Sequence, residues 1–406
     1  MKPASFVCMT IFSLLSAISV VAQANKPVAF RQLAALIASD GQPDDYLGYS
    51  VAISGNTLVV GAPQNGNVNG GAGKAYVYIK PATGWANATQ TAELTPSDGV
   101  PGLFFGWKVA ISGNTIVVDA GSYDGSEMQA VYVFVEPEGG WTNMTETAKL
   151  TLTNGNYLYT VAISGNTIAA AATEENEDQG AVYIFEKPKS GWRTGLKPSA
   201  TLTALAGGGY FLGFALGLSG DTVVATSINH AAYVFVKPSS GWVDATQTAE
   251  LTASNETGTD EFGDSVAING KTIVVGAPES GPGQEYYGAA YLYYEPSSGW
   301  VSATQNAEIM ASNFAADNFF GVSVAVSGSL TAIGANGVTV GGNEYEGAAY
   351  VFAAGTQVAE LTSNPETQLE GLGWSTAADG ETVFSGAIYA TVGDNSGQGV
   401  VFVFAP

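Results

Sequence analysis

The hexapeptide SVAISG at residues 50–55 recurs along the chain with small changes. Its closing glycines lie 50 to 58 residues apart. The other copies are KVAISG at 108–113, TVAISG at 160–165, ALGLSG at 215–220, SVAING at 265–270, SVAVSG at 323–328 and STAADG at 375–380. Seven units of this length indicate an architecture in which one supersecondary unit stacks on the next.

Each unit carries four strand signals. The hexapeptide is followed by a tight Gly-Asn turn and a second apolar run, TLVVGAP at 57–63 in the first unit. A Gly/Asn-rich loop leads to a third, aromatic run, such as AAYVFV at 231–236, and a Pro-x-x-Gly-Trp connection leads to a polar run, ATQTAEL at 245–251. Continuous apolar runs suit strands covered on both faces, and alternation suits a half-exposed strand. This gradient predicts an all-β, seven-bladed β-propeller of four-stranded blades, with strand one innermost and no helix.

The two ends of the repeat array complement each other. The seventh unit stops after its third strand, GVVFVF at 399–404, and residues 32–41, QLAALIASDG, align with residues 90–99, QTAELTPSDG. We therefore predict that the N-terminal strand completes the last blade and closes the ring, which covers an otherwise open edge.

The first residues are typical of a secretory signal peptide. Lys2 is followed by an apolar stretch at 6–21 and by AQA at 22–24, a small-x-small cleavage signal. We expect cleavage after Ala24, a secreted or cell-surface protein, and one propeller domain over 25–406. No later run reaches the roughly 18 apolar residues that spanning a bilayer requires, so we expect no transmembrane segment.

Charge and histidine content narrow the function classes. The formal net charge is −23, which disfavours nucleic acid and favours a neutral or cationic partner. His230 is the sole histidine, and no nucleophile elbow accompanies it, so a Ser-His-Asp hydrolase is disfavoured. A hydrolase using a pair of carboxylates stays open as an alternative.

The units resemble the FG-GAP repeat, the blade unit of the integrin α-chain propeller. The motif is Phe262-Gly263 before strand one and Gly276-Ala277-Pro278 after strand two of the fifth unit. The resemblance implies a propeller with a binding or adhesion role. Many such repeats hold calcium in an Asp-x-Asp-x-Asp-Gly loop between strands one and two. Here that connection is only SGNT, as at 54–57, so we expect no calcium and no other cofactor.

The strand order places the connections from strand four to strand one and from strand two to strand three on one face, here called the loop-rich face. Binding commonly uses variable loops on a rigid scaffold. The candidate ligand-binding residues on these loops are Asp44, Asp45, Tyr46, Tyr123, Asp124, Glu174, Glu175, Tyr286, Tyr287, Glu344 and Tyr345.

Other aromatic residues have a structural interpretation. We expect the aromatic residues around the Phe-Gly motif to pack between blades; they are Phe104, Phe105, Phe319 and Phe320. The same applies to the tryptophans that recur at one place in five units; they are Trp85, Trp141, Trp192, Trp242 and Trp300.

Three hypotheses about function follow. The first is an exported, monomeric adhesion or recognition protein, not an enzyme, that binds a protein or glycan through the loop-rich face. The second is an extracellular carbohydrate or ester hydrolase, which requires carboxylates converging at the axial mouth of the ring. The third is a structural surface protein without a specific ligand.

Overall fold

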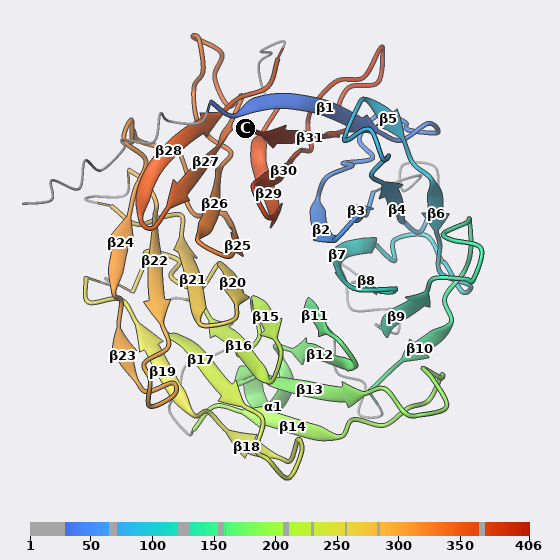
Figure 1. The fold of residues 1–406 in the computed structure, drawn as a ribbon, viewed down its shortest axis with the longest axis vertical. Coiled ribbons are helices and arrows are strands. Elements are labelled where there is room, and N and C mark those ends of the chain that lie inside the picture. The colour runs from blue at the N-terminus through green and yellow to red at the C-terminus, as the bar shows by residue number, and fades with distance from the viewer. Residues whose placement is uncertain are drawn as a thin grey trace, which may run out of the picture.

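A computed structural model describes residues 29–64, 71–120, 130–152, 158, 160–205, 211–228, 231–255, 258–281, 285–364 and 370–406. Seven sheets of antiparallel strands stand around one axis as the blades of a propeller, as predicted (Figure 1). The expected signal peptide, residues 1–24, lies outside the described residues, and so does His230.

Each blade has four strands, counted outward from the axis. The innermost strands are β2 (Ser50–Ser54), β7 (Phe105–Ser112), β11 (Thr160–Ser164), β15 (Leu216–Ser219), β20 (Ser265–Asn269), β25 (Ser323–Ser327) and β29 (Leu372–Asp379). The second strands are β3 (Thr57–Ala62), β8 (Thr115–Ala120), β12 (Thr167–Ala172), β16 (Thr222–Ser227), β21 (Thr272–Ala277), β26 (Leu330–Ala335) and β30 (Thr382–Ala387). The third strands are β4 (Lys74–Ile79), β9 (Ala130–Val135), β13 (Ala181–Glu186), β17 (Ala231–Val236), β22 (Ala289–Tyr294), β27 (Ala348–Ala353) and β31 (Val400–Ala405). The outer strands are β6 (Ala92–Leu94), β10 (Ala148–Leu150), β14 (Ala200–Thr203), β19 (Ala249–Thr252), β24 (Ala307–Ile309), β28 (Thr356–Leu361) and β1 (Arg31–Ile37).

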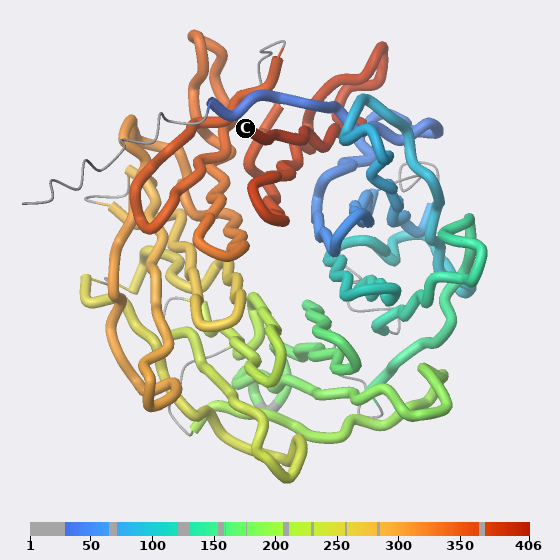
Figure 2. Tube along the Cα trace, in the orientation of Figure 1, coloured from blue at the N-terminus to red at the C-terminus, as the bar shows by residue number. Residues whose placement is uncertain are grey.

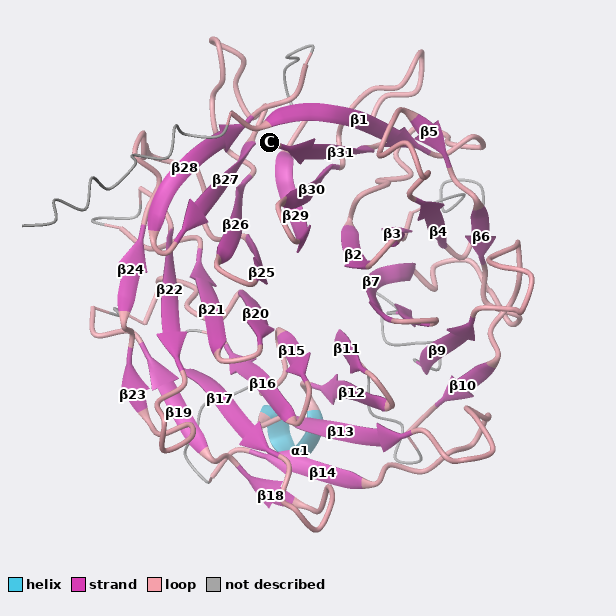
Figure 3. Cartoon of the chain, in the orientation of Figure 1, coloured by secondary structure: helices cyan, strands magenta, loops and turns pink. Residues whose placement is uncertain are grey.

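Short elements complete the fold. Three two-residue strands, β5 (Ala88–Thr89), β18 (Ala245–Thr246) and β23 (Ala303–Thr304), precede outer strands. Each of them pairs in parallel with the outer strand of the preceding blade, which ties neighbouring blades together at the rim. A single-turn helix, α1 (Glu175–Asp178), lies between β12 and β13 (Figure 3). The sequence did not predict this helix, because one turn is too short to produce a helical period.

The N-terminal strand closes the ring, as predicted. Strand β1 pairs antiparallel with β31, with Arg31 opposite Ala405 and Leu36 opposite Val401. Figure 2 shows this start of the described chain, in blue, running beside its red C-terminal end. Leu36 is fully buried in a core that also contains Val403 and Tyr76. The last blade is therefore assembled from both ends of the repeat array.

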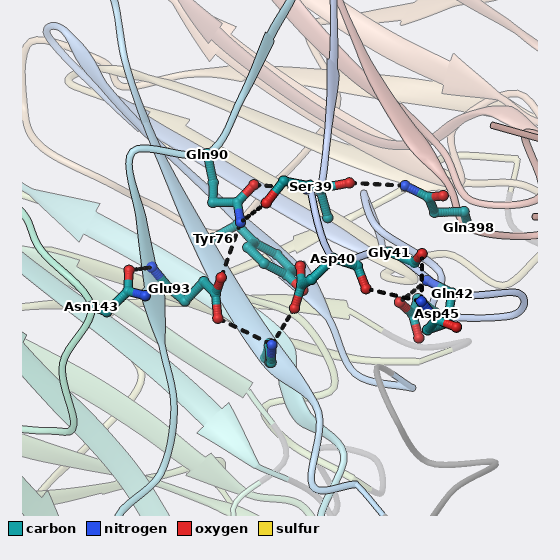
Figure 4. Close-up of polar contacts among 12 residues, drawn as sticks. Ser39, Asp40, Gly41, Gln42, Asp45, Tyr76, Gln90, Glu93, Asn143 and Gln398 are labelled. Carbon is teal, nitrogen blue, oxygen red and sulfur yellow. Dashed lines mark hydrogen bonds and ion pairs between the residues drawn. The ribbon is translucent and has the colours of Figure 1, made fainter. Parts of the chain in front are cut away.

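A polar network fastens the segment after β1 to the first blade (Figure 4). The Asp40 carboxylate accepts hydrogen bonds from the Lys74 ammonium and from the Tyr76 hydroxyl, the latter at 2.9 Å. Lys74 also bonds Glu93 at 3.1 Å. Burial, with the charge of Asp40 adding to it, raises the pKa of Tyr76, so the hydroxyl stays a donor.

The next blade repeats this arrangement. The Asp98 carboxylate accepts from the Lys149 ammonium and from the Tyr132 hydroxyl, the latter at 3.0 Å. Burial alone would raise the pKa of Asp98, but the bonds from Lys149 and Tyr132 outweigh it and hold the pKa below its ordinary value. The aligned segments 32–41 and 90–99 thus occupy equivalent places in the ring.

The recurring Phe-Gly and Gly-Ala-Pro motifs lock neighbouring blades together. A Cβ atom on Gly276 would lie 2.0 Å from the carbonyl oxygen of Gly321 in the next blade, so no side chain fits there. The Ser265 hydroxyl donates to that same carbonyl at 2.7 Å. In the fourth blade, where Thr226 replaces the glycine, the Thr226 hydroxyl makes the equivalent bond to Gly263 at 2.6 Å. The motif is therefore an inter-blade contact.

The Ser-Gly turn after strand one is a second inter-blade contact, close to the axis. The Gly113 amide donates to the Ser54 hydroxyl oxygen of the preceding blade at 3.1 Å. Equivalent bonds run from Gly165 to Ser112, from Gly220 to Ser164, from Gly270 to Ser219 and from Gly380 to Ser327. The hexapeptide therefore recurs because its Ser-Gly turn forms hydrogen bonds between neighbouring blades.

The five recurring tryptophans are buried, as predicted. Their exposed fractions lie between 5% and 9%. Each belongs to a hydrophobic core between blades; Trp85, for example, packs edge-on against Phe384 of the preceding blade with ring centroids 5.2 Å apart. They stabilise the ring at the face opposite the loop-rich face.

Candidate functional site

A four-residue turn introduces strand one in six blades and shapes the centre of the loop-rich face. Its first residue has a left-handed backbone, its second is a buried Phe or Leu, its third is the glycine of the Phe-Gly motif, and its fourth enters the axial opening. The left-handed residues are Tyr46, Phe104, Phe211, Glu261, Phe319 and Gly371, with φ between 51° and 66°. The amide of the fourth residue donates to the carbonyl of the first, for example from Trp107 to Phe104 at 3.2 Å.

This turn refines one sequence-based expectation. Phe105 and Phe320, at the second position, are buried between blades as predicted. Phe104 and Phe319 stand at the first position and are less buried than Phe105 and Phe320: both remain half-exposed on the loop-rich face, although Phe319 does pack against Tyr286 of the fifth blade. A positive φ is costly for an aromatic residue, and such strain is concentrated at functional sites.

The first and fourth positions of these turns bring aromatic side chains together around the axis. Tyr49 packs against Trp107 at 4.6 Å and against Trp374 at 5.5 Å between ring centroids. Trp107 in turn contacts Phe104 edge-on at 6.3 Å. Trp374 contacts Tyr389, at 6.0 Å, from the loop between β30 and β31. These side chains belong to the first, second and seventh blades.

The same surface extends over the fifth and sixth blades. Tyr286 stacks on Phe319 with ring centroids 5.6 Å apart and planes 19° apart. Phe319 and Tyr345 line one cavity with Trp374 and Tyr389. We name the whole set the aromatic arc; it comprises Tyr46, Tyr49, Phe104, Trp107, Tyr286, Phe319, Tyr345, Trp374 and Tyr389.

Three candidate residues from the sequence belong to this arc. Tyr46 contacts Tyr389 edge-on at 5.5 Å. Burial and the neighbouring charge of Asp44 raise the pKa of Tyr46. Tyr286 and Tyr345 also have positive φ values, 34° and 53°. Asp44 and Glu344 are exposed beside Tyr46 and Tyr345, so they add negative charge to the edge of the arc.

The other sequence-predicted candidates do not belong to the aromatic arc: three make hydrogen bonds within their own loops or blades, one lies at helix α1, and two lie outside the described residues. Asp45 is buried and accepts a hydrogen bond from the Gln42 amide at 2.7 Å, which shapes its loop. Glu175 accepts from the Tyr183 hydroxyl, and Tyr287 donates to Glu285. Glu174 is exposed at the start of α1, in the third blade. Tyr123 and Asp124 lie outside the described residues.

Sequence reasoning missed four members of the arc: Tyr49, Trp107, Trp374 and Tyr389. The first three directly follow the Phe-Gly or Leu-Gly motif of their blades. An alignment of the seven units by this one position would have shown the aromatic column. Tyr389 lies in a variable loop, and no periodic signal marks it.

The axial opening forms a cavity of about 380 Å³ that the innermost strands surround. Tyr49, Trp107 and Trp374 line it together with Lys108 and Asp264. Aromatic and charged side chains therefore meet at the axis. The hydrolase hypothesis requires carboxylates at this mouth, and Asp264 is one.

Three charged residues at or next to the axial opening have shifted pKa values: Asp264, Glu261 and Lys108. Burial, partly opposed by Lys108, raises the pKa of Asp264 to about 6. Burial and the charges of Asp264 and Glu279 raise the pKa of Glu261 to about 7. Burial lowers the pKa of Lys108 against the pull of Asp264 and Asp119. Two carboxyl groups of one blade thus titrate near neutral pH.

Neither a metal centre nor a membrane-spanning helix is found in the part of the chain that the structure describes. No group of three or more His, Cys, Asp or Glu side chains there is arranged to hold a metal ion. No helix there is long and apolar enough to cross a membrane.

Comparison with known proteins identifies the repeat. The FG-GAP repeat family matches residues 30–78, 88–134, 245–293 and 303–352. Each match begins at the outer strand of one blade or at the two-residue strand before it, and ends in the third strand of the next blade. This is the same offset that lets β1 complete the last blade. No curated protein matches the sequence. The four matches and the seven-bladed ring make this chain an FG-GAP repeat protein.

Proposed function

We propose that this protein is an exported binding protein that recognises a protein or glycan through the aromatic arc on its loop-rich face. The observation that supports this most strongly is the clustering of aromatic side chains from five blades around the axial opening. Half-exposed aromatic residues supply large contact areas at low entropic cost and are enriched in binding surfaces.

The backbone of the arc also supports a binding role. Phe104, Phe319 and Tyr345 adopt left-handed conformations that cost each residue about 1–3 kcal/mol. The left-handed turn recurs in six blades and so belongs to the repeat, and at Phe104 and Phe319 it holds an aromatic ring half-exposed on the loop-rich face, where a ligand can contact it. The alternative of a structural protein with a featureless loop face fits these observations less well.

The experiment is a screen of glycan and protein arrays with the secreted protein. Trp107→Ala and Trp374→Ala should each weaken binding to any ligand found by about tenfold or more, since hot-spot truncations cost about 2 kcal/mol. Val301→Ala is the matched control, because Val301 is an exposed apolar residue that directly follows Trp300 at the opposite face. A ligand whose affinity falls with Val301→Ala but not with the tryptophan variants would refute the proposal.

Hydrolysis is the second candidate function, and Asp264 at the axial mouth favours it together with Glu261 of the same turn. Glycoside hydrolysis uses one protonated and one ionised carboxyl group, and Glu261 and Asp264 have pKa values of about 7 and 6. Chromogenic glycosides and esters test it directly. Turnover that Asp264→Asn abolishes, while array binding stays absent, would favour the enzyme over the binding protein.

A further inference from the structure

A cavity of about 250 Å³ opens within the aromatic arc, between the sixth and seventh blades. Four aromatic side chains wall it, three from separate loops and one, Trp374, from strand β29; they are Phe319, Tyr345, Trp374 and Tyr389. Backbone bonds join the walls, from the Gly371 amide to the Tyr345 carbonyl and from the Tyr389 amide to the Glu370 carbonyl, both at 3.1 Å. The cavity is therefore built into the blade junction.

One wall of the cavity lies where one blade departs from the repeat. Gly371 stands where four other blades carry a left-handed aromatic residue, and its φ of 66° matches theirs. A Cβ atom on Gly371 would meet the nearest atom, on the Tyr389 ring, at 3.1 Å, so the Tyr389 ring occupies the place that a side chain on Gly371 would take. The absence of a side chain at Gly371 thus allows Tyr389 to form one wall of the cavity.

Among its charged side chains, the chain segment that contains every lining residue carries only negative ones. Beyond Lys271 the sequence has no Lys, Arg or His up to residue 406, against thirteen Asp and Glu residues. Two exposed carboxylates are close in sequence to residues that wall the cavity: Glu344 directly precedes Tyr345, and Asp317 lies two residues before Phe319. These carboxylates attract a cation entering this region, and Lys108, which lines the axial opening together with Trp374, is the positive side chain that opposes them.

We propose that this cavity is an aromatic cage for an alkylated ammonium group, such as a quaternary ammonium. This inference rests on the proposed binding role of the same face and narrows it to one ligand class. Aromatic faces attract organic cations through their quadrupoles, and a quaternary ammonium loses little hydration on entering. The acidic surroundings add long-range attraction.

A sugar ring fits the cavity less well. Buried hydroxyl groups need hydrogen-bond partners, and an unpaired one costs binding energy. Besides the hydroxyl groups of Tyr345 and Tyr389, the lining offers one polar side chain, that of Asn336, whose Oδ1 is buried. Few hydrogen-bond partners are thus available for the several hydroxyl groups of a sugar, and the negative charge favours the cation.

The test measures choline binding to the intact protein by ligand-observed NMR, with 3,3-dimethylbutanol as the uncharged isostere. Choline should bind at least about tenfold more tightly than the isostere. Gly371→Phe should abolish this binding, because its side chain would displace the Tyr389 ring from the cavity wall. Val301→Ala, an exposed position at the opposite face, should change the binding less than about twofold. Trp374→Ala removes a wall and should weaken binding about tenfold, which provides a second variant if Gly371→Phe fails to fold.

Several outcomes would overturn the cage. Equal binding of choline and the isostere, tight binding of a methyl glycoside in place of choline, or choline binding that survives both Gly371→Phe and Trp374→Ala would each do so. Phosphatidylcholine vesicles and a peptide carrying trimethyl-lysine distinguish a lipid from a protein source of the cation. An array ligand that depends on Trp107 but tolerates Gly371→Phe would leave the binding role intact and remove only the cage.

Discussion

Replacing Leu36 with alanine tests whether β1 is a full member of the last blade. Leu36 is completely buried in the core between the seventh and first blades. The backbone pairing of β1 with β31 would remain, so the loss comes from transfer free energy and the cavity that is left. Leu→Ala changes at such sites cost about 2–5 kcal/mol, and we expect about 3 kcal/mol.

Urea unfolding followed by tryptophan fluorescence measures this loss. With a slope of about 3 kcal/mol/M, the midpoint should fall by about 1 M. Leu361→Ala, at a buried position of the outer strand β28, should cost the same, because Leu361 is 2% exposed. Val358→Ala, on the exposed side of β28, should change the midpoint by less than about 0.2 M. If Leu36→Ala resembled Val358→Ala, the ring would not depend on the N-terminal strand.

Three further predictions concern the inter-blade contacts and the axial mouth. Gly276→Ala should destabilise the protein by about 3 kcal/mol in urea unfolding, because its Cβ would lie 2.0 Å from a carbonyl oxygen; Gly84→Ala, with open space around it, should cost about 1 kcal/mol. Thr226→Val should cost about 1–3 kcal/mol in the same assay, since it removes the 2.6 Å bond to Gly263. The pKa of Asp264 is about 6 in the folded protein against 3.8 ordinarily, so its contribution to stability falls as pH rises from about 4 to 6. Asp264→Asn should therefore increase the free energy of unfolding by about 2 kcal/mol more at pH 8 than at pH 4, as measured by urea unfolding at both pH values. An equal effect at both pH values would contradict the raised pKa of Asp264.

The repeat made the fold predictable from sequence. The hexapeptide marks every blade because its Ser-Gly turn bonds the neighbouring blade, as from Gly113 to Ser54. The alignment of residues 32–41 with 90–99 predicted ring closure, and the equivalent contacts of Asp40 and Asp98 explain why the two segments look alike. Periodic contacts leave periodic residues, and these are visible without a structure.

The site was predictable only in part. Tyr46, Tyr286 and Tyr345 were found because they lie in variable loops on the expected face. The exposure of Phe319 depends on a left-handed turn that residue type does not reveal. The cavity depends on Tyr389, which packs beside Gly371 from a variable loop, and no periodic signal marks that residue.

The binding face is the central claim, and a hydrogen-exchange footprint tests it most directly. The tightest ligand from the array screen would be added to the intact protein, and amide exchange compared with and without it. Protection should concentrate at residues 44–49, 104–107, 371–374 and 388–392, which carry most of the aromatic arc. Protection confined to the Pro-x-x-Gly-Trp connections, such as residues 238–242 and 296–300, would place binding on the opposite face and contradict the account.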